Sequence, residues 1–212
     1  MQDRLTGRTL VIATGHTLSL ALLEGRDVLA ESSSVMQRGH AEALMPEIVN
    51  LLAPFGGPDA RCSRIVVEVG PGSFTGLRVG IAAAKALALV WGCTILGVRS
   101  TQLVAAEARM RGMRGPLAVA LAAPRGQIWF ERFGADGLNS LGPSVAHAAD
   151  DLARHIDAGD SVVGSAGPVR EDCMMEGHPR AAALAGVVES DLMRAEPLYV
   201  RVGEMESNSG KI

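Results

Sequence analysis

A strand that leads through a glycine-rich turn into a long apolar helix is the feature that most constrains this fold. Residues 65–69 form a β-branched run, which is typical of a strand buried on both faces of a sheet. Residues 70–80 carry a proline between two glycines and open a helix that reaches about Trp91. A strand, a tight turn and a helix in succession predict an α/β protein.

The flanking segments extend this unit into a mixed sheet with helices on it. Apolar or alternating runs predict strands at 9–14, 18–23, 28–35 and 94–98, and helical spacing predicts helices at 40–53 and 100–110. We expect Ser100 or Thr101 to cap the helix at 100–110. Beyond residue 102 the pattern weakens and predicts a hairpin of 117–122 and 127–133, a strand at 161–163 and helices at 146–156 and 180–190.

This change of pattern predicts the domain organisation. We expect residues 1–102 to form a first lobe that carries the partner interface, and 103–203 to form a smaller second lobe. The polar residues 204–212 are expected to be a flexible tail. At 212 residues the chain is long enough to bury a core without disulfides or metals.

Charge and composition exclude nucleic-acid binding by this chain alone. The 20 Lys and Arg residues are balanced by 23 Asp and Glu residues, so no basic field attracts a polyanion. Aromatic residues make up only 3% of the chain, which leaves few rings on which bases could stack. A solvated face is the preferred interpretation of the local arginine excess, at Arg99, Arg109, Arg111, Arg114, Arg125 and Arg132.

Cysteine use and the apolar segments predict a cytoplasmic protein. Cys62, Cys93 and Cys173 are odd in number and lack metal-ligand spacing, so reduced thiols are expected. The start of the chain is charged and shows no signal-peptide core. Residues 79–97 are apolar but interrupted by Lys85, which favours a helix followed by a strand over a membrane span.

Two features of the glycine-rich segment have alternative interpretations. Amides exposed at a helix N-terminus can bind an anion, but the Gly-Lys-Ser/Thr ending of a P-loop is absent. We therefore favour a structural turn capped by Ser73 or Thr75. Small residues recur every four positions along the helix, at Gly76, Gly80, Ala84 and Ala88. Such a face lets another helix approach closely, whether from this chain or from another subunit, and periodicity does not choose between them.

The sequence Gly-Pro-Gly-Ser-Phe-Thr-Gly-Leu-Arg-Val-Gly at 70–80 resembles the signature of the bacterial TsaB (YeaZ) family. Residues 10–22 resemble the opening strand pair of that family, 38–46 its first-helix motif and 197–201 its C-terminal motif. The resemblance covers 9–104 well and 105–201 in patches. It implies the ASKHA fold of actin, Hsp70 and sugar kinases, an α/β architecture of two related lobes of which the second is degenerate.

The resemblance also implies a function as a non-catalytic subunit. Such proteins pair with TsaD, the catalytic subunit that makes N6-threonylcarbamoyladenosine at position 37 of tRNAs reading ANN codons. Helices 40–53 and 75–90 would contact TsaD, or a second copy when the chain is alone, whereas the TsaE ATPase and tRNA would join only through the complex. No membrane partner is implied. The residues expected at the partner interface are His40, Leu44, Ile48, Phe74, Gly76, Leu77, Gly80, Ala84 and Leu87.

Departures from related motifs predict that the chain has no catalytic, cofactor or metal site of its own. TsaD carries a His-x-x-x-His metal motif where this chain has Arg99, Ser100 and Val104, and valine offers no donor atom to a metal. The family usually has an acid in the first hairpin, where Ala13 stands here. Without that carboxylate, metal-bound phosphate chemistry loses its charge partner, so ATP or ADP is expected only at the interface of the complex.

Two other functions compete with the scaffold. An ATP-dependent enzyme of the same fold, a small kinase or carbamoyl-type transferase, would bind ATP between the lobes and turn over alone, which Ala13 argues against. A metallopeptidase would need the absent His-x-x-x-His motif. The histidines are scattered, and surface or capping roles are expected for them.

Overall fold

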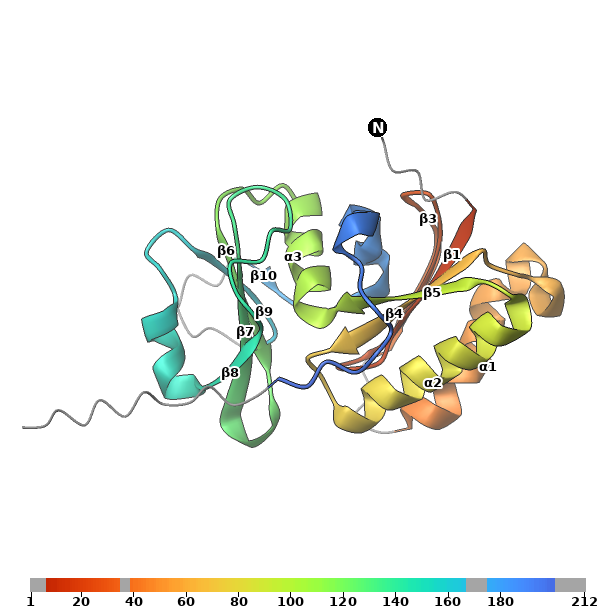
Figure 1. Ribbon diagram of the computed structural model, residues 1–212, viewed down its shortest axis with the longest axis horizontal. Coiled ribbons are helices and arrows are strands. Elements are labelled where there is room, and N and C mark those ends of the chain that lie inside the picture. Colours follow the sequence, from red (N-terminus) through yellow and green to blue (C-terminus); the bar gives the residue numbers. More distant parts are fainter. Residues whose placement is uncertain (1–6, 35–38, 167–174, 201–212) are drawn as a thin grey trace, which may run out of the picture.

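The computed structural model describes residues 7–34, 39–166 and 175–200, which form two five-stranded sheets with helices between and outside them (Figure 1). The first sheet has the order β3-β2-β1-β4-β5. Its strands are β1 (Arg8–Ala13), β2 (Leu18–Glu24), β3 (Asp27–Ser34), β4 (Arg64–Gly70) and β5 (Thr94–Arg99). β1, β2 and β3 form an antiparallel meander, and β4 and β5 run parallel to β1.

Helices cover both faces of this first sheet. α1 (His40–Leu52) and α2 (Phe74–Trp91) lie on one face, where their apolar sides pack on alternate residues of β1, β2 and β4. α3 (Ser100–Met110) and the 3-10 helix η5 (Ala181–Gly186) lie on the other face. Because both faces are covered, β4 is buried almost throughout, as its β-branched sequence predicts.

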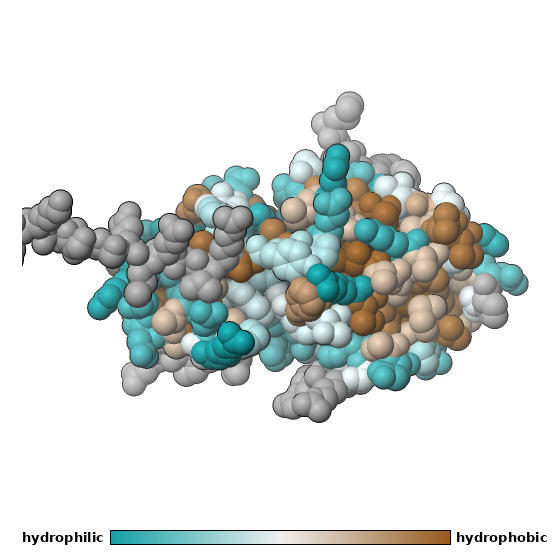
Figure 2. Space-filling view, turned by 60° about the horizontal axis from the view of Figure 1, so that its bottom comes forward, coloured by the Kyte–Doolittle hydropathy of each residue, from teal (hydrophilic) through white to brown (hydrophobic). Residues whose placement is uncertain are grey.

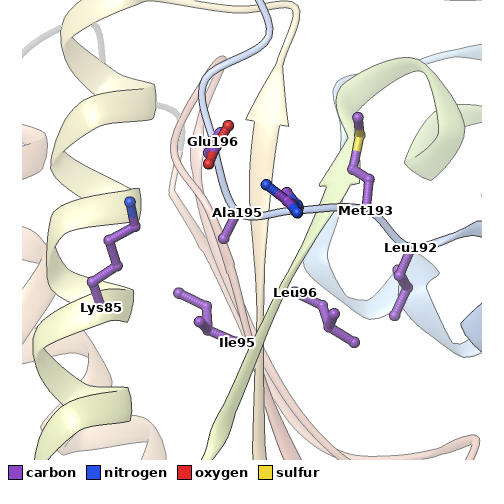
Figure 3. A pocket seen from close by; sticks show the side chains of 8 residues that line it. Lys85, Ile95, Leu96, Leu192, Met193, Ala195 and Glu196 are labelled. Carbon is purple, nitrogen blue, oxygen red and sulfur yellow. The ribbon is translucent and has the colours of Figure 1, made fainter.

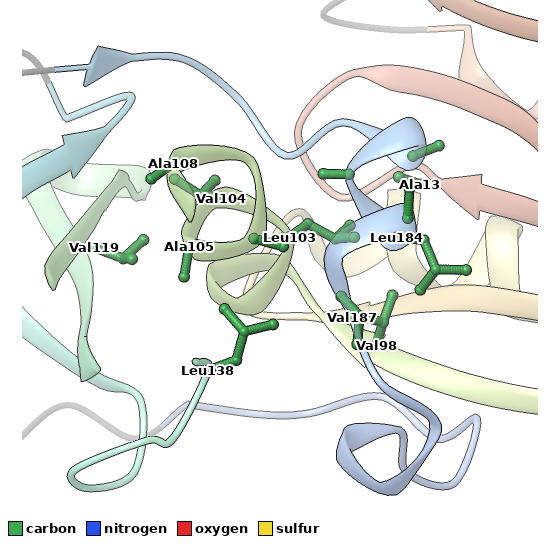
Figure 4. Close-up of a cluster of buried hydrophobic side chains, with 14 of the residues drawn as sticks. Ala13, Val98, Leu103, Val104, Ala105, Ala108, Val119, Leu138, Leu184 and Val187 are labelled. Atoms are coloured by element: carbon green, nitrogen blue, oxygen red, sulfur yellow. The ribbon is translucent and has the colours of Figure 1, made fainter. Parts of the chain in front are cut away.

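The layer of α3 and η5 joins the first sheet to the second in a single apolar core (Figure 4). Nine residues of α3 are buried, so this helix is enclosed nearly all round. η5 packs between α3 and the strands β1 to β3, and most of its buried side chains are alanines. The alanine-rich sequence of η5 is thus explained by a narrow space between a helix and a sheet.

The second sheet has the order β10-β9-β6-β7-β8 within the described residues. Its strands are β6 (Leu117–Ala122), β7 (Gln127–Phe133), β8 (Val145–Ala148), β9 (Ser161–Gly164) and β10 (Met175–Glu176). The predicted β6–β7 hairpin is confirmed, with the 3-10 turn η3 (Pro124–Gly126) at its tip. The face of this sheet that is turned away from α3 packs on the 3-10 helix η4 (Ala149–His155).

The prediction of two helices in the second half of the chain is wrong. The segment 146–156 begins as β8, which pairs with β7, and continues as η4. The segment 180–190 is divided between η5 and a short 3-10 helix, η6 (Glu189–Asp191). Strand pairing with a distant segment decided the first case, and helical spacing within a window does not report such pairing.

The predicted boundary between lobes at 102/103 is also wrong, because it falls inside α3. In addition, the chain returns to the first sheet after β10. The Met193 and Gly97 backbones exchange two hydrogen bonds, and the Leu198 amide donates to the Val69 carbonyl at 2.7 Å. The first lobe is therefore completed by the last described residues, and the expected tail at 204–212 lies outside the described residues.

α2 is the one helix of the described chain that is long and apolar enough to span a membrane by length and composition. Its sheet-facing side is buried within the protein, and β5 follows it after a short turn. The prediction of a helix followed by a strand for residues 79–97 is confirmed.

Candidate partner-binding face

The glycine-rich turn before α2 packs tightly against the turn between β1 and β2. Ser73 caps α2 by accepting a hydrogen bond from the Gly76 amide at 3.3 Å, and its own amide donates to the Gly15 carbonyl at 2.7 Å. A Cβ on Gly72 would lie 2.9 Å from the Gly15 Cα. Glycine is therefore required for the close approach of two backbones, which agrees with a structural turn.

The stripe of small residues on α2 faces the end of β1, not another helix. A Cβ on Gly76 would overlap the Thr14 carbonyl oxygen, and one on Gly80 would overlap the Thr14 hydroxyl. That hydroxyl donates to the Gly76 carbonyl at 2.8 Å. The prediction of a helix partner is therefore wrong for Gly76 and Gly80, where the cost of glycine inside α2 is offset by packing on Thr14.

Most of the predicted interface residues consequently lie in the core. Those buried between α1, α2 and the chain's own first sheet are Leu44, Ile48, Gly76, Leu77, Gly80 and Ala84. In this structure their side chains are not accessible to a partner, which corrects their assignment to the interface. Of the remaining three, Phe74 is 55% exposed, and His40 and Leu87 are partly exposed.

The opposite side of the same two helices is both exposed and apolar. We call it the outer face, defined by Met45, Val49, Phe74, Leu89 and Val90, each of them an exposed large apolar residue. Leu89 is 85% exposed. Figure 2 shows apolar residues gathered over this side of the molecule. Exposed apolar patches of this kind on a helix pair mark interaction sites.

The sequence also contains a periodic signal for the outer face. Met45 and Val49 are four residues apart on α1, and Ala82, Ala86 and Val90 are four apart on α2. All five are exposed. α2 therefore has two lines of apolar residues: the line that contains the glycines faces the sheet, and the second line is exposed. Periodicity alone indicates the second line.

A cluster of two aromatic rings and one arginine closes the N-terminal end of the outer face. The Arg78 guanidinium lies 3.6 Å from the centre of the Phe74 ring and donates to the Tyr199 hydroxyl at 2.8 Å. A cavity of about 150 Å³ lies beside it, lined by Pro71, Trp129 and other residues of the turn and C-terminal segment. The cluster fixes the C-terminal segment on the start of α2.

A second hollow lies at the free edge of β5, between α2 and the C-terminal segment (Figure 3). Its volume is about 480 Å³, and Ile95 and Leu96 lie on its sheet side. Lys85 and Glu196 approach it from α2 and from the C-terminal segment. The rest of the lining is apolar apart from Arg194, so the hollow holds two cations and one carboxylate, which is no arrangement for nucleophilic or metal chemistry.

The positions that correspond to the TsaD metal motif serve packing and structural hydrogen bonds. Arg99 forms an ion pair with the buried Glu131 at 3.2 Å, and Val104 is fully buried. Ser100 donates to Glu68 at 2.5 Å and Thr101 to Glu131 at 2.5 Å. Neither hydroxyl caps α3, so the predicted cap is wrong. No group of three or more His, Cys, Asp or Glu residues within the described segments could hold a metal ion.

Ala13, where the family usually has an acid, is buried in an apolar core. It is 1% exposed and belongs to the core shared with α3 and η5. A carboxylate there would be buried among apolar groups, at a high cost in desolvation. The apolar surroundings of Ala13 therefore agree with the expected loss of phosphate chemistry at this position.

The arginine excess around the second sheet is largely held by the protein itself. Arg109 and Arg114 donate to backbone carbonyls, and three others pair with carboxylates: Arg99 with Glu131, Arg111 with Glu107, and Arg132 with Asp157 and Asp160. The neighbouring carboxylates raise the pKa of Arg132, Asp160 foremost. Guanidinium groups that are already paired offer little to phosphates.

His147 and His155 lie in two different elements and contact each other. One is in β8 and the other ends η4, and their rings stack with centroids 3.8 Å apart. Burial lowers the pKa of His147, and the neighbouring His155 adds to the effect. His16 lies in the turn after β1, as expected, and its Nε2 is 2.9 Å from the Pro71 carbonyl oxygen.

These features define the class of protein: a two-lobe α/β protein with an exposed apolar face on the helices of its first lobe. The family model of TsaD, described as tRNA N6-adenosine threonylcarbamoyltransferase, matches residues 28–190. An uncharacterized protein of Mycobacterium tuberculosis strain H37Rv is 32% identical over 181 residues, 82% of this chain and 81% of that protein. The tRNA threonylcarbamoyladenosine biosynthesis protein TsaB of Bacillus subtilis is 35% identical over 117 residues, 55% of this chain and 50% of TsaB.

Solved structures give the same fold. YeaZ from Pseudomonas aeruginosa superposes with a TM-score of 0.75 at 22% identity, covering 91% of this chain and 99% of YeaZ. The chain belongs to the family that the TsaD model describes, and it is similar to TsaB and YeaZ. The predicted resemblance and the two-lobe ASKHA fold class are thereby confirmed.

Proposed function

We propose that this chain is the non-catalytic scaffold subunit of a threonylcarbamoyl-transfer complex. In that complex a TsaD-type catalytic subunit makes N6-threonylcarbamoyladenosine at position 37 of tRNAs reading ANN codons. The chain activates TsaD by forming a heterodimer through the outer face of α1 and α2. The exposed apolar side chains of that face, from Met45 to Val90, are the observation that carries the proposal.

Family membership and the state of the motif positions support this function. The matching family model is named for the transferase reaction, and the Bacillus subtilis relative is named as a biosynthesis protein of the same modified nucleoside. Arg99, Ser100 and Val104 are engaged in an ion pair, a hydrogen bond and the core. A supporting role beside a catalytic relative fits these positions better than catalysis by the chain itself.

The other components of the complex follow from the same proposal. The outer face pairs two copies into a homodimer when TsaD is absent, because an exposed apolar surface of this kind self-associates. The TsaE ATPase and tRNA bind the assembled complex. ATP or ADP is held at the interface between subunits, not by this chain alone, in keeping with an apolar setting for Ala13.

Reconstitution tests the proposed function directly. Purified TsaD, TsaE and the other components of the modification reaction are incubated with an ANN-reading tRNA, with and without this chain, and the modified nucleoside is measured by mass spectrometry. We expect modification only with the chain present. A chain that carries Val49→Glu and Leu89→Glu serves as the matched control, since it retains the fold and loses the outer face. Equal modification without the chain contradicts the proposal.

A further inference from the structure

A buried carboxylate at the end of β4 has no role in the outer face or in the proposed complex. Glu68 is 1% exposed, and two neutral groups donate to it. The Gly15 amide donates to Oε2 at 2.6 Å, and the Ser100 hydroxyl donates to Oε1 at 2.5 Å. Hydrogen bonds to an ionised acceptor are stronger than neutral ones, and a buried carboxylate depends on them.

The donors come from two different elements that converge on this carboxylate. Gly15 belongs to the turn between β1 and β2, and Ser100 is the first residue of α3. The N-cap of α3, Arg99, makes no side-chain capping hydrogen bond. The Glu68 carboxylate therefore lies at the N-terminus of α3, where the helix dipole favours a carboxylate.

The space around the carboxylate is full. A Cβ on Gly15 would lie 2.9 Å from Glu68 Oε1 and 2.9 Å from a methyl carbon of Leu77. Ser100 is fully buried. An external oxyanion thus has neither a free donor nor room at this corner while Glu68 is in place.

We propose that Glu68 fills, from within the chain, an oxyanion site formed by the Gly15 amide and the Ser100 hydroxyl. The site is closed to external anions, nucleotide phosphates included, in the wild-type chain. It accepts a small carboxylate once the side chain is shortened. Acetate is the matching probe, because Glu68→Ala removes one methylene and one carboxylate, the groups that acetate provides. This inference does not depend on the proposed scaffold role.

Chemical rescue tests the inference on the full chain. Thermal unfolding of Glu68→Ala is followed at pH 7 in sodium acetate and in sodium chloride of equal ionic strength. We expect acetate to raise the Tm of this variant by about 2–4 °C over chloride and to leave the wild type unchanged. Glu68→Gln, which keeps the volume filled, and Leu103→Ala, which opens an apolar cavity in α3, are the matched controls. Equal Tm values for Glu68→Ala in both salts, or equal shifts in the controls, overturn the proposal.

A measurement on the wild type covers the case in which Glu68→Ala does not fold. The Gly15 amide proton is assigned by NMR, and its hydrogen exchange is compared with that of Gly25, which lies in an exposed turn. We expect the Gly15 amide to exchange at least 100-fold more slowly and to resonate downfield. Exchange of Gly15 as fast as that of Gly25 shows that the carboxylate does not hold this donor, and refutes the assignment.

Discussion

The two sides of α2 are both apolar, yet they do different things. The inner side carries glycines and alanines that let the helix touch Thr14 and the end of β1. The outer side carries Leu89 and Val90, whose side chains remain exposed within the described chain. Small residues on a helix therefore do not by themselves indicate a partner subunit. Large apolar residues without cover are the better indicator.

Substitution on the inner side has the largest expected effect. In Gly76→Val the new side chain meets the Thr14 carbonyl oxygen, which is backbone and cannot move aside cheaply. We expect the free energy of unfolding to fall by about 3 kcal/mol or more, from overpacking and backbone displacement. Denaturation in urea, monitored by circular dichroism, measures it. Ala82→Val, on the outer side, is the control, and a similar loss there removes the distinction between the two sides.

Substitution on the outer side is expected to affect association instead. In Val49→Glu and Leu89→Glu a charge is placed on an exposed apolar residue, so the monomer loses at most about 0.5 kcal/mol of stability. Binding to TsaD should weaken about tenfold or more per substitution, as for a central interface residue. Titration calorimetry with purified TsaD measures the affinity. Unchanged affinity in both variants places the interface elsewhere.

A smaller effect is expected at the end of the outer side. In Tyr199→Phe the acceptor for Arg78 is lost while the ring remains, so stability should fall by about 0.5–1.5 kcal/mol. The C-terminal segment should then be cleaved faster by protease at 193–200. Val28→Ala on β3 serves as a control of similar exposure. Cleavage at the wild-type rate shows that the Leu198–Val69 hydrogen bond holds the segment without the tyrosine.

Thiol labelling distinguishes a buried cysteine from a partly exposed one without a substitution in the core. Cys62 is buried beneath the helices, and burial raises the pKa of its thiol to about 11. Burial also raises the pKa of Cys93, which is partly exposed at the end of α2. Because a pKa near 11 leaves about one thiolate in a thousand at pH 8, Cys62 should stay unlabelled while Cys93 reacts slowly. A Cys173→Ser background removes the third thiol, and labelling of Cys62 as fast as Cys93 contradicts this burial.

Local sequence patterns predicted the first lobe well. The strands, helices and turn from residue 8 to residue 110 follow their predicted ranges within a few residues, because each has a clear period and clear punctuation. The second lobe was predicted less well. β8 exists because residues 145–148 pair with β7, and η4 and η5 are 3-10 helices held between larger elements. Such non-local pairing leaves little trace in a short window.

The candidate site shows the same difference between local sequence patterns and non-local contacts. Of the residues predicted at the interface, Phe74 is exposed on the outer face, whereas six others lie in the core. The sequence also predicted that Ser100 or Thr101 caps α3, whereas the Ser100 hydroxyl donates a hydrogen bond to Glu68. Glu68 lies 32 residues from Ser100, so no local pattern could link them.

The sequence alone determined the strand–turn–helix unit, the α/β class and the family, because a specific motif and clear periodicity carry that information. Only the tertiary structure decided which side of α2 faces the sheet. Periodicity shows that a helix has an apolar side, but not what covers it. The glycines contact Thr14 on the inner side, and the larger side chains on the opposite side remain exposed.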